Sequence, residues 1–236
     1  MAGWILRAAT VSPAAAAHLA VRWLGFPSIA SIERRLPQQG VILDAGCGHG
    51  LLALLAAARG PDREIVGVDL LEDRVAFART LAAGAGLTNA RFEKRSFDPP
   101  PQGPFDAIII ADALFYCGLP EQRRILAALS AELAPGGRLF VSEQTAEPRW
   151  KAALVALQER AIVAFRVRLA GKAAWASIAP TGVHLWPAEG LAETLRSLGL
   201  SVESLRLDRG CWLSHRLFIA EAAEAREREA AAPIAR

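Results

Sequence analysis

The stretch VILDAGCGHG, Val41 to Gly50, concentrates residues that could bind a ligand through their backbone. It places three glycines and one carboxylate directly behind a short apolar run. Because glycine adopts positive φ angles readily and has no Cβ, such a turn lets the backbone approach a ligand closely. The apolar run predicts a strand over residues 40–46, and LLALLAAAR predicts a helix over residues 51–59. We therefore expect a ligand site at the turn between them.

Two classes of cofactor are bound by a turn of this kind, and the residues around it favour one of them. In the dinucleotide fingerprint G-x-G-x-x-G the third glycine would fall at Leu51, whereas here it comes one position early, at Gly50. Asp44 lies two residues before the first glycine. Its carboxylate would repel a pyrophosphate and attract an ammonium or a sulfonium. A sulfonium cofactor is favoured, with an NAD-dependent oxidoreductase as the enzyme alternative.

The rest of the chain alternates short apolar runs with longer segments of 3.6-residue period, which is typical of an α/β protein with a parallel sheet. Further strands are predicted over residues 64–70, 90–97, 105–115, 138–143, 201–208 and 215–222, and further helices over 72–86, 120–133 and 187–199. The run Ile108 to Ile110 predicts a strand buried on both faces in the middle of the sheet. The last two strands are expected to pair as a hairpin.

Composition limits the class of protein. The 236 residues suit one globular domain, and a net charge of only +3 without a run of Lys or Arg makes a nucleic-acid partner improbable. Three widely spaced cysteines, Cys47, Cys117 and Cys211, favour reduced thiols in a cytoplasmic protein, and no metal-ligand spacing is present. The first twenty residues have neither the basic start of a secretory signal nor the continuous span of a transmembrane helix.

Four motifs in order carry a specific resemblance. VILDAGCGHG, VGVDL, FDAIIIADALFYC and LAPGGRLFVSE, within residues 38–145, resemble the motif set of the class I S-adenosylmethionine-dependent methyltransferases. LWPAEGLAETLRSLGLSVESL, residues 185–205, is similar to the penultimate helix and strand of that family. The resemblance implies a Rossmann-like, doubly wound, seven-stranded and mostly parallel sheet of order 3-2-1-4-5-7-6. It also implies S-adenosyl-L-methionine as cofactor and S-adenosyl-L-homocysteine as product.

The resemblance also implies which residues bind the cofactor. Asp44 would meet the methionine amino group, and Asp69 would accept both ribose hydroxyls, with a helix N-cap as its structural alternative. Many relatives end the third strand with an acid that accepts the adenine amino group, but this chain has Ser96 there, beside Phe97; Asp98 could substitute if the loop shifts. The expected cofactor-binding residues are Asp44, Ala45, Gly46, Cys47, Gly48, Gly50, Asp69, Leu70, Ser96, Phe97 and Asp112.

Methyl transfer from a sulfonium is an in-line displacement, so alignment and a dry site can supply much of its rate. A base is needed only where the acceptor loses a proton. ADALFYC, after the fourth strand, differs from the N-P-P-[YF] sequence of the amide and base N-methyltransferases, which argues against such acceptors. Tyr116 falls where small-molecule and lipid methyltransferases often place a side chain facing the methyl group; otherwise it is a half-buried aromatic. Asp112 either positions Tyr116 or contributes only backbone to the cofactor site.

Other titratable residues are weaker candidates. Glu143, at the carboxyl end of the fifth strand, is expected to be a substrate or base residue, or else a solvated loop acid or a partner for Arg149. His184 and His215 could serve as bases, although a lone histidine is more often a surface or packed residue. Asp106, which opens the fourth strand, is expected to be structural.

The remaining segments suggest an apolar acceptor. Residues 1–36 are expected to form a helical lid or docking segment, in which Trp4 and Trp23 lie near Arg7 and Arg22, as a membrane interface favours. Residues 37–222 would be the methyltransferase domain with a helical cap inserted over about 145–184, and the charged tail 223–236 is expected to fray. The expected acceptor is a small phenolic, polyketide-like or lipid molecule. The expected location is cytoplasmic or peripheral at the inner membrane surface, with membrane contact through the N-terminal helices. A non-catalytic cofactor-binding or membrane-docking protein is the alternative from another class.

Overall fold

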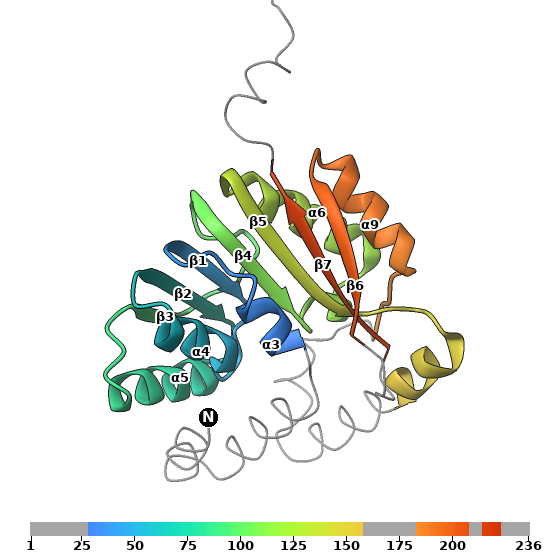
Figure 1. Cartoon of the computed structure of the whole chain (residues 1–236). Coiled ribbons are helices and arrows are strands. Elements are labelled where there is room, and N and C mark those ends of the chain that lie inside the picture. Colours follow the sequence, from blue (N-terminus) through green and yellow to red (C-terminus); the bar gives the residue numbers. More distant parts are fainter. Residues whose placement is uncertain (1–27, 158–182, 208–213, 223–236) are drawn as a thin grey trace, which may run out of the picture.

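A computed structural model describes residues 28–157, 183–207 and 214–222, which form a seven-stranded sheet with helices on both faces (Figure 1). The order of the strands is β3-β2-β1-β4-β5-β7-β6, which confirms the order that the resemblance implied. The strands are β1 (Gly40–Ala45), β2 (Arg63–Asp69), β3 (Ala90–Lys94), β4 (Phe105–Ala111), β5 (Leu133–Gln144), β6 (Ser201–Arg206) and β7 (His215–Glu221).

The helices divide between the two faces of the sheet, because the strands bury side chains on both. Ile109 of β4 belongs to a core cluster shared with α3, α4 and α5, whereas its neighbours Ile108 and Ile110 belong to a cluster shared with α6 and α9. This alternation is the period of two of a strand buried on both faces. The helical elements are α3 (Ser28–Glu33), α4 (Leu51–Arg59), α5 (Glu72–Gly84), the 3₁₀ turn η1 (Leu114–Tyr116), α6 (Leu119–Ala131) and α9 (Ala188–Ser197).

The directions of the strands gather the candidate site residues at one edge of the sheet. All pairs between β3, β2, β1, β4 and β5 are parallel, whereas β7 is antiparallel to both β5 and β6. The amino end of β7, at His215, therefore lies beside the carboxyl end of β5, where the register pairs it with Gln144. The last two strands do pair antiparallel, as their sequence predicts.

Several element boundaries differ from the sequence prediction. The strand predicted to reach residue 115 ends at Ala111, because Asp112 has φ 55° and its N–H donates to the Ser142 carbonyl oxygen; η1 follows. The strand predicted over 138–143 begins at Leu133, where one pair with Phe105 precedes a register shift. The strand predicted to reach residue 97 ends at Lys94.

A buried ion pair fixes α3 against the start of β2. Arg63 donates to the carbonyl oxygens of Pro37 and Ala56, and its guanidinium lies 3.4 Å from the carboxylate of Glu33, which also pairs with Arg59. Removing one partner of such a group would leave an uncompensated buried charge. This part of the predicted segment 1–36 therefore packs on the sheet domain.

The other predicted segments are described only in part. Residues 1–27 and the tail 223–236 lie outside the described residues, as does 158–182 of the predicted cap, whose residues 149–157 are helical. The described helices include none that is both long and apolar enough to cross a membrane.

Candidate active site

The glycine turn after β1 combines two tightly packed positions with one open position. The φ angles of Gly46, Gly48 and Gly50 are 80°, 55° and 77°, a region that favours glycine. A Cβ at Gly50 would lie 2.8 Å from the Ala78 Cβ, and one at Gly46 would lie 3.1 Å from the Ala113 Cβ. A Cβ at Gly48 would meet nothing within 4 Å. The backbone of Gly48 therefore faces open space that a ligand can occupy.

Asp69 connects the glycine turn to the end of β2. Its carboxylate is only 8% exposed; Oδ2 accepts from the Gly48 N–H at 2.9 Å, and Oδ1 accepts from the Leu71 N–H at 2.9 Å. Leu71 is the N-cap residue of α5, and no side chain forms a capping hydrogen bond there, so the structural alternative of Asp69 as a helix N-cap is wrong. Each carboxylate oxygen can accept more than one hydrogen bond, so ribose hydroxyls still have acceptors here. Leu70, next to it, is an apolar side chain 48% exposed.

Asp44 and Asp69 make the turn electrostatically negative and outweigh Arg74, whose guanidinium lies 4.0 Å from Asp69 Oδ2. Burial raises the pKa of the Cys47 thiol, and the two carboxylates raise it further. The thiol is consequently protonated and unsuited to be a nucleophile. The same field favours a cation such as a sulfonium over a pyrophosphate. The predicted residues Asp44, Ala45, Gly46, Cys47, Gly48 and Gly50 are thus brought together with Asp69 and Leu70.

The loop after β3 meets the same turn through an aromatic ring. The Phe97 ring lies 3.4 Å from the place where a Gly46 Cβ would be. Ser96 accepts a hydrogen bond from the Asp98 N–H at 2.9 Å. Both carboxylate oxygens of Asp98 accept from the Arg124 guanidinium, at 2.7 Å for Oδ1, so Asp98 is engaged with α6. This pairing argues against Asp98 as a substitute for Ser96.

Glu143 is a buried residue that fixes the segment after β4. It is 3% exposed, and its Oε1 accepts from the N–H groups of Ala113 at 3.0 Å and Leu114 at 2.8 Å. Burial, followed by the charge of Asp112, raises the pKa of the Glu143 carboxyl well above its ordinary value. The alternative of a solvated loop acid is therefore wrong, and its carboxylate bonds to backbone rather than to Arg149.

Asp112 and His215 form a buried pair that links the segment after β4 to the start of β7. His215 Nε2 lies 2.9 Å from Asp112 Oδ1, and both side chains are buried. The Ser142 hydroxyl lies 3.5 Å from the same ring nitrogen. Neither predicted role of Asp112 included this contact. It brings a histidine considered as a base to the edge of the predicted cofactor site.

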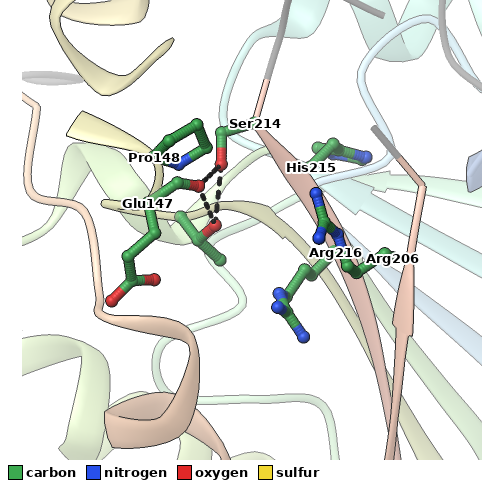
Figure 2. A pocket seen from close by; sticks show the side chains of 7 residues that line it. Glu147, Pro148, Arg206, Ser214, His215 and Arg216 are labelled. Atoms are coloured by element: carbon green, nitrogen blue, oxygen red, sulfur yellow. Dashed lines mark hydrogen bonds between the residues drawn. The ribbon is translucent and has the colours of Figure 1, made fainter. Parts of the chain in front are cut away.

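A cleft of about 220 Å³ opens beside this histidine (Figure 2). The hydroxyl oxygens of Ser214 and Thr145 lie 2.8 Å apart on one side of it, and each also lies within hydrogen-bond distance of the Glu147 carbonyl oxygen. The residues that line it are Thr145, Glu147, Pro148, Arg206, Ser214, His215 and Arg216. Of the predicted site residues, only His215 lies in this lining.

The other predicted residues lie near β4. The ring of Tyr116, in η1, packs against that of Phe115 with centroids 4.2 Å apart, and the His184 N–H donates to the Phe115 carbonyl oxygen. Asp106 accepts from the Val41 N–H at 2.7 Å, which confirms its structural role. The described residues, 28–157, 183–207 and 214–222, include no group of three or more His, Cys, Asp or Glu side chains that could hold a metal ion.

Sequence reasoning missed Gln122, a buried amide of α6. Its Nε2 donates to the carbonyl oxygens of Cys117 and His184, and its Oε1 accepts from the Trp186 indole at 2.6 Å. These bonds fix the segment after β4 against residues 184–186. A glutamine within a helix gives no sequence signal for such a role.

Comparison with known proteins identifies the family. A family model described as a methyltransferase domain matches residues 42–137. The demethylmenaquinone methyltransferase of Thermus thermophilus is 33% identical over 165 residues, which cover 68% of this chain and 74% of that protein. The chain belongs to the class I S-adenosylmethionine-dependent methyltransferases. Its cofactor is S-adenosylmethionine, and the NAD-dependent and non-catalytic alternatives are not favoured.

Two further methyltransferases illustrate the range of similarity. The ubiquinone biosynthesis O-methyltransferase of Xylella fastidiosa is 30% identical over 182 residues, 74% of this chain and 66% of that protein. The 1,6-didemethyltoxoflavin-N1-methyltransferase of Burkholderia thailandensis, solved with its substrate and S-adenosylhomocysteine, matches with a TM-score of 0.62 at 20% identity. That match covers 84% of this chain and 78% of the other and supports the fold alone.

Proposed function

We propose that this methyltransferase transfers the methyl group to a hydroxyl oxygen of a small, largely apolar aromatic acceptor. The observation that carries the proposal is the buried Asp112–His215 pair, whose histidine also lines the cleft. A hydroxyl acceptor must lose a proton, and a histidine oriented by a carboxylate is a general base. The names of two relatives, a demethylmenaquinone and a ubiquinone biosynthesis O-methyltransferase, support a small quinone-like or phenolic acceptor.

The residues at the glycine turn suit S-adenosylmethionine. We assign the methionine ammonium to the negative surroundings of Asp44 and the ribose hydroxyls to Asp69. The exposed Leu70 side chain and the Phe97 ring would contact the adenine, because Leu70 follows Asp69 directly and the Phe97 ring lies beside the turn at Gly46. When bound, S-adenosylmethionine supplies a methyl carbon that bonds to the acceptor oxygen as the carbon–sulfur bond breaks.

His215 would take the acceptor proton. The imidazole bonds through Nε2 to the Asp112 carboxylate, which would orient the ring and stabilise the imidazolium. In this scheme the acceptor O–H bond breaks and its proton passes to the imidazole as the oxygen bonds to the methyl carbon. Asp112 is a positioning residue in this scheme.

Glu143 and Tyr116 would complete the site. Because Glu143 accepts from the N–H groups of Ala113 and Leu114, we assign it to positioning of the segment that carries Asp112 rather than to proton transfer. Tyr116 follows in η1, and we propose that its ring faces the acceptor.

The experiment compares His215→Gln with His184→Gln in radiolabelled methyl transfer to a panel of catechols and hydroxyquinols. We expect His215→Gln to lower kcat by about 10²-fold to 10⁴-fold, the usual contribution of a general base. S-adenosylhomocysteine affinity, measured by calorimetry, should stay unchanged. Asp112→Asn, whose side chain tolerates the positive φ, should lower kcat and shift the pH profile. A wild-type kcat in His215→Gln, or a larger loss in His184→Gln, would refute the assignment.

A further inference from the structure

We infer that the buried carboxyl group of Glu143 recognises the positive charge of the sulfonium in S-adenosylmethionine. When the cofactor binds, the group loses its proton to solvent and becomes a counter-charge for the sulfonium. Glu143 thereby raises the affinity for S-adenosylmethionine relative to S-adenosylhomocysteine, whose sulfur is neutral. The inference concerns the cofactor alone, so it does not depend on the nature of the acceptor or on His215 as the base.

The first support is the position of Glu143 behind the glycine turn. Its Oε1 accepts from the Ala113 N–H at 3.0 Å. The Ala113 Cβ lies 3.1 Å from the place where a Gly46 Cβ would be. Ala113 therefore connects the carboxyl group to the turn whose open face, at Gly48, can hold the cofactor. Across such a short stretch of protein interior, two charges interact more strongly than they do in water.

The second support is a carboxyl oxygen that the described protein groups leave unsatisfied. Glu143 is 3% exposed, and its Oε1 accepts from the N–H groups of Ala113 and Leu114. Within residues 28–157, 183–207 and 214–222, Oε2 has no hydrogen-bond partner. A buried polar atom without a partner is destabilising, most of all when the group is charged. A cationic ligand nearby offsets this cost, whereas a neutral one does not.

The third support is the balance of charges around Glu143. Burial, followed by the charge of Asp112, raises the pKa of its carboxyl group well above the ordinary value. This holds even though β7 places Arg216 opposite Glu143 in register. The protein itself therefore supplies too little positive charge to ionise the group easily. The titratable and charged groups on the surrounding elements are Asp112 after β4, Cys117 after η1, Glu121 and Arg124 of α6, and His215 and Arg216 of β7.

These observations link cofactor binding to a proton. Below its raised pKa, the Glu143 carboxyl group of the free protein is neutral. A sulfonium favours the charged form, so the O–H bond breaks, the electron pair stays on the carboxylate and the proton passes to solvent. The ammonium and carboxylate of the methionine moiety are common to both ligands, so the difference between them reports the sulfonium. After methyl transfer the sulfur is neutral, and return of the proton to Glu143 favours exchange of the product for new cofactor.

The test measures binding of S-adenosylmethionine and S-adenosylhomocysteine to the full-length protein by isothermal titration calorimetry, without an acceptor. Glu143→Gln keeps an acceptor oxygen for Ala113 and Leu114 but carries no charge. At about pH 8, the affinity ratio of S-adenosylmethionine to S-adenosylhomocysteine should be about tenfold higher in the wild type than in this variant. The wild-type ratio should fall toward that of the variant as the pH is lowered to about 5, because Glu143 then stays protonated.

Glu132→Gln is the matched control. Glu132 directly precedes β5 at the opposite end of this strand, and its Oε2 accepts from the Gly103 N–H at 2.5 Å. It is thus also a carboxylate bonded to a backbone amide, but it lies away from the glycine turn. Its substitution should leave the affinity ratio at the wild-type value. Glu143→Asp, which keeps a titrating carboxyl group, should retain part of the wild-type ratio.

The proton is counted by repeating the titrations in buffers of different ionisation enthalpy. S-adenosylmethionine should release more protons than S-adenosylhomocysteine from the wild type, and the excess should vanish in Glu143→Gln. An equal affinity ratio in the wild type and folded Glu143→Gln, or equal proton release by the two ligands from the wild type, would overturn the inference. Equal loss of affinity for both ligands would assign Glu143 to the ammonium instead. Thermal unfolding identifies misfolded variants, in which case the wild-type proton count decides.

Discussion

Glu143 shows how a carboxyl group acquires its role from its surroundings. Two backbone N–H groups donate to one of its oxygens and favour the charged form, whereas burial and the charge of Asp112 favour the protonated form. The pKa is raised overall, so desolvation outweighs the hydrogen bonds. Oε2 has no hydrogen-bond partner within the described part of the chain, which adds to the cost of ionisation.

The first prediction is a pH-dependent stability difference for Glu143→Gln. The amide keeps an acceptor oxygen for Ala113 and Leu114 but does not titrate. The folded pKa of Glu143 is raised above its ordinary value of 4.5. Relative to the variant, the wild type therefore has its full stability below that ordinary value and loses stability as the pH rises through the folded pKa. Thermal unfolding from about pH 4 to pH 8 measures the difference in Tm. A difference that stays constant over this range would contradict the prediction.

The sequence indicates local roles better than long-range ones. The places of Asp44 in β1 and of Asp69 at the end of β2 could be predicted because each lies in a short motif of its own strand. The Asp112–His215 contact joins residues 103 positions apart, and only the strand order brings them together. For the same reason Glu143 could not be recognised as a partner of the Ala113 and Leu114 amides.

The glycines of the turn after β1 differ in their surroundings. Gly48 and Gly50 share a positive φ, but only Gly50 is packed, against Ala78 and Phe92. Gly50 is also the residue before α4, so it sets how the helix leaves the turn. Two glycines of one motif thus differ in their surroundings: Gly48 faces open space, whereas Gly50 packs against the core.

The second prediction compares Gly48→Ala with Gly50→Ala. Both substitutions place a side chain in the left-handed region, at a cost of about 1–2 kcal/mol. Gly50→Ala also overpacks the core, since its Cβ would lie 2.8 Å from that of Ala78, which typically costs a further ~1–3 kcal/mol. Urea unfolding should show the larger loss for Gly50→Ala.

Calorimetry with S-adenosylhomocysteine should show the larger loss of affinity for Gly48→Ala. Gly48→Ala should stay folded and bind the cofactor product more weakly, because its methyl group enters the open face. Undiminished affinity in folded Gly48→Ala would mean that the cofactor does not bind at the open face, and equal stability of the two variants would contradict the tight packing at Gly50.

Element types followed from periodicity, whereas element ends depended on tertiary contacts. The isoleucine run of β4 and the amphipathic pattern of α9 indicated both elements correctly. The end of β4 at Ala111 depends on the positive φ of Asp112 and its bond to Ser142 in the neighbouring strand. A sequence window around residue 112 holds no information about that neighbour.

The order of the strands explains why the candidate site residues gather at one edge of the sheet. The crossover from β1 to β4 places the glycine turn beside Ala113, and the reversed β7 returns His215 and Arg216 to the same edge. The cofactor region and the cleft therefore lie on one side, joined by Asp112 and His215. Docking of residues 1–36 on a membrane stays a prediction, since only residues from Ser28 onward are described.

The last prediction concerns the rise in Tm that a bound cofactor product should cause. A ligand that binds only the folded state at a hundredfold excess over its Kd stabilises it by ~2.7 kcal/mol. In a domain of this size each kcal/mol raises the Tm by about 2–4 °C, so S-adenosylhomocysteine should raise it by roughly 5–10 °C. NAD at the same concentration should give no shift. Asp69→Asn removes a charged hydrogen-bond acceptor, a loss of about 1.5–3 kcal/mol, so its shift should fall to about half or less. A full shift in folded Asp69→Asn would show that the ribose binds elsewhere, and a comparable shift with NAD would show that the site does not discriminate against a pyrophosphate.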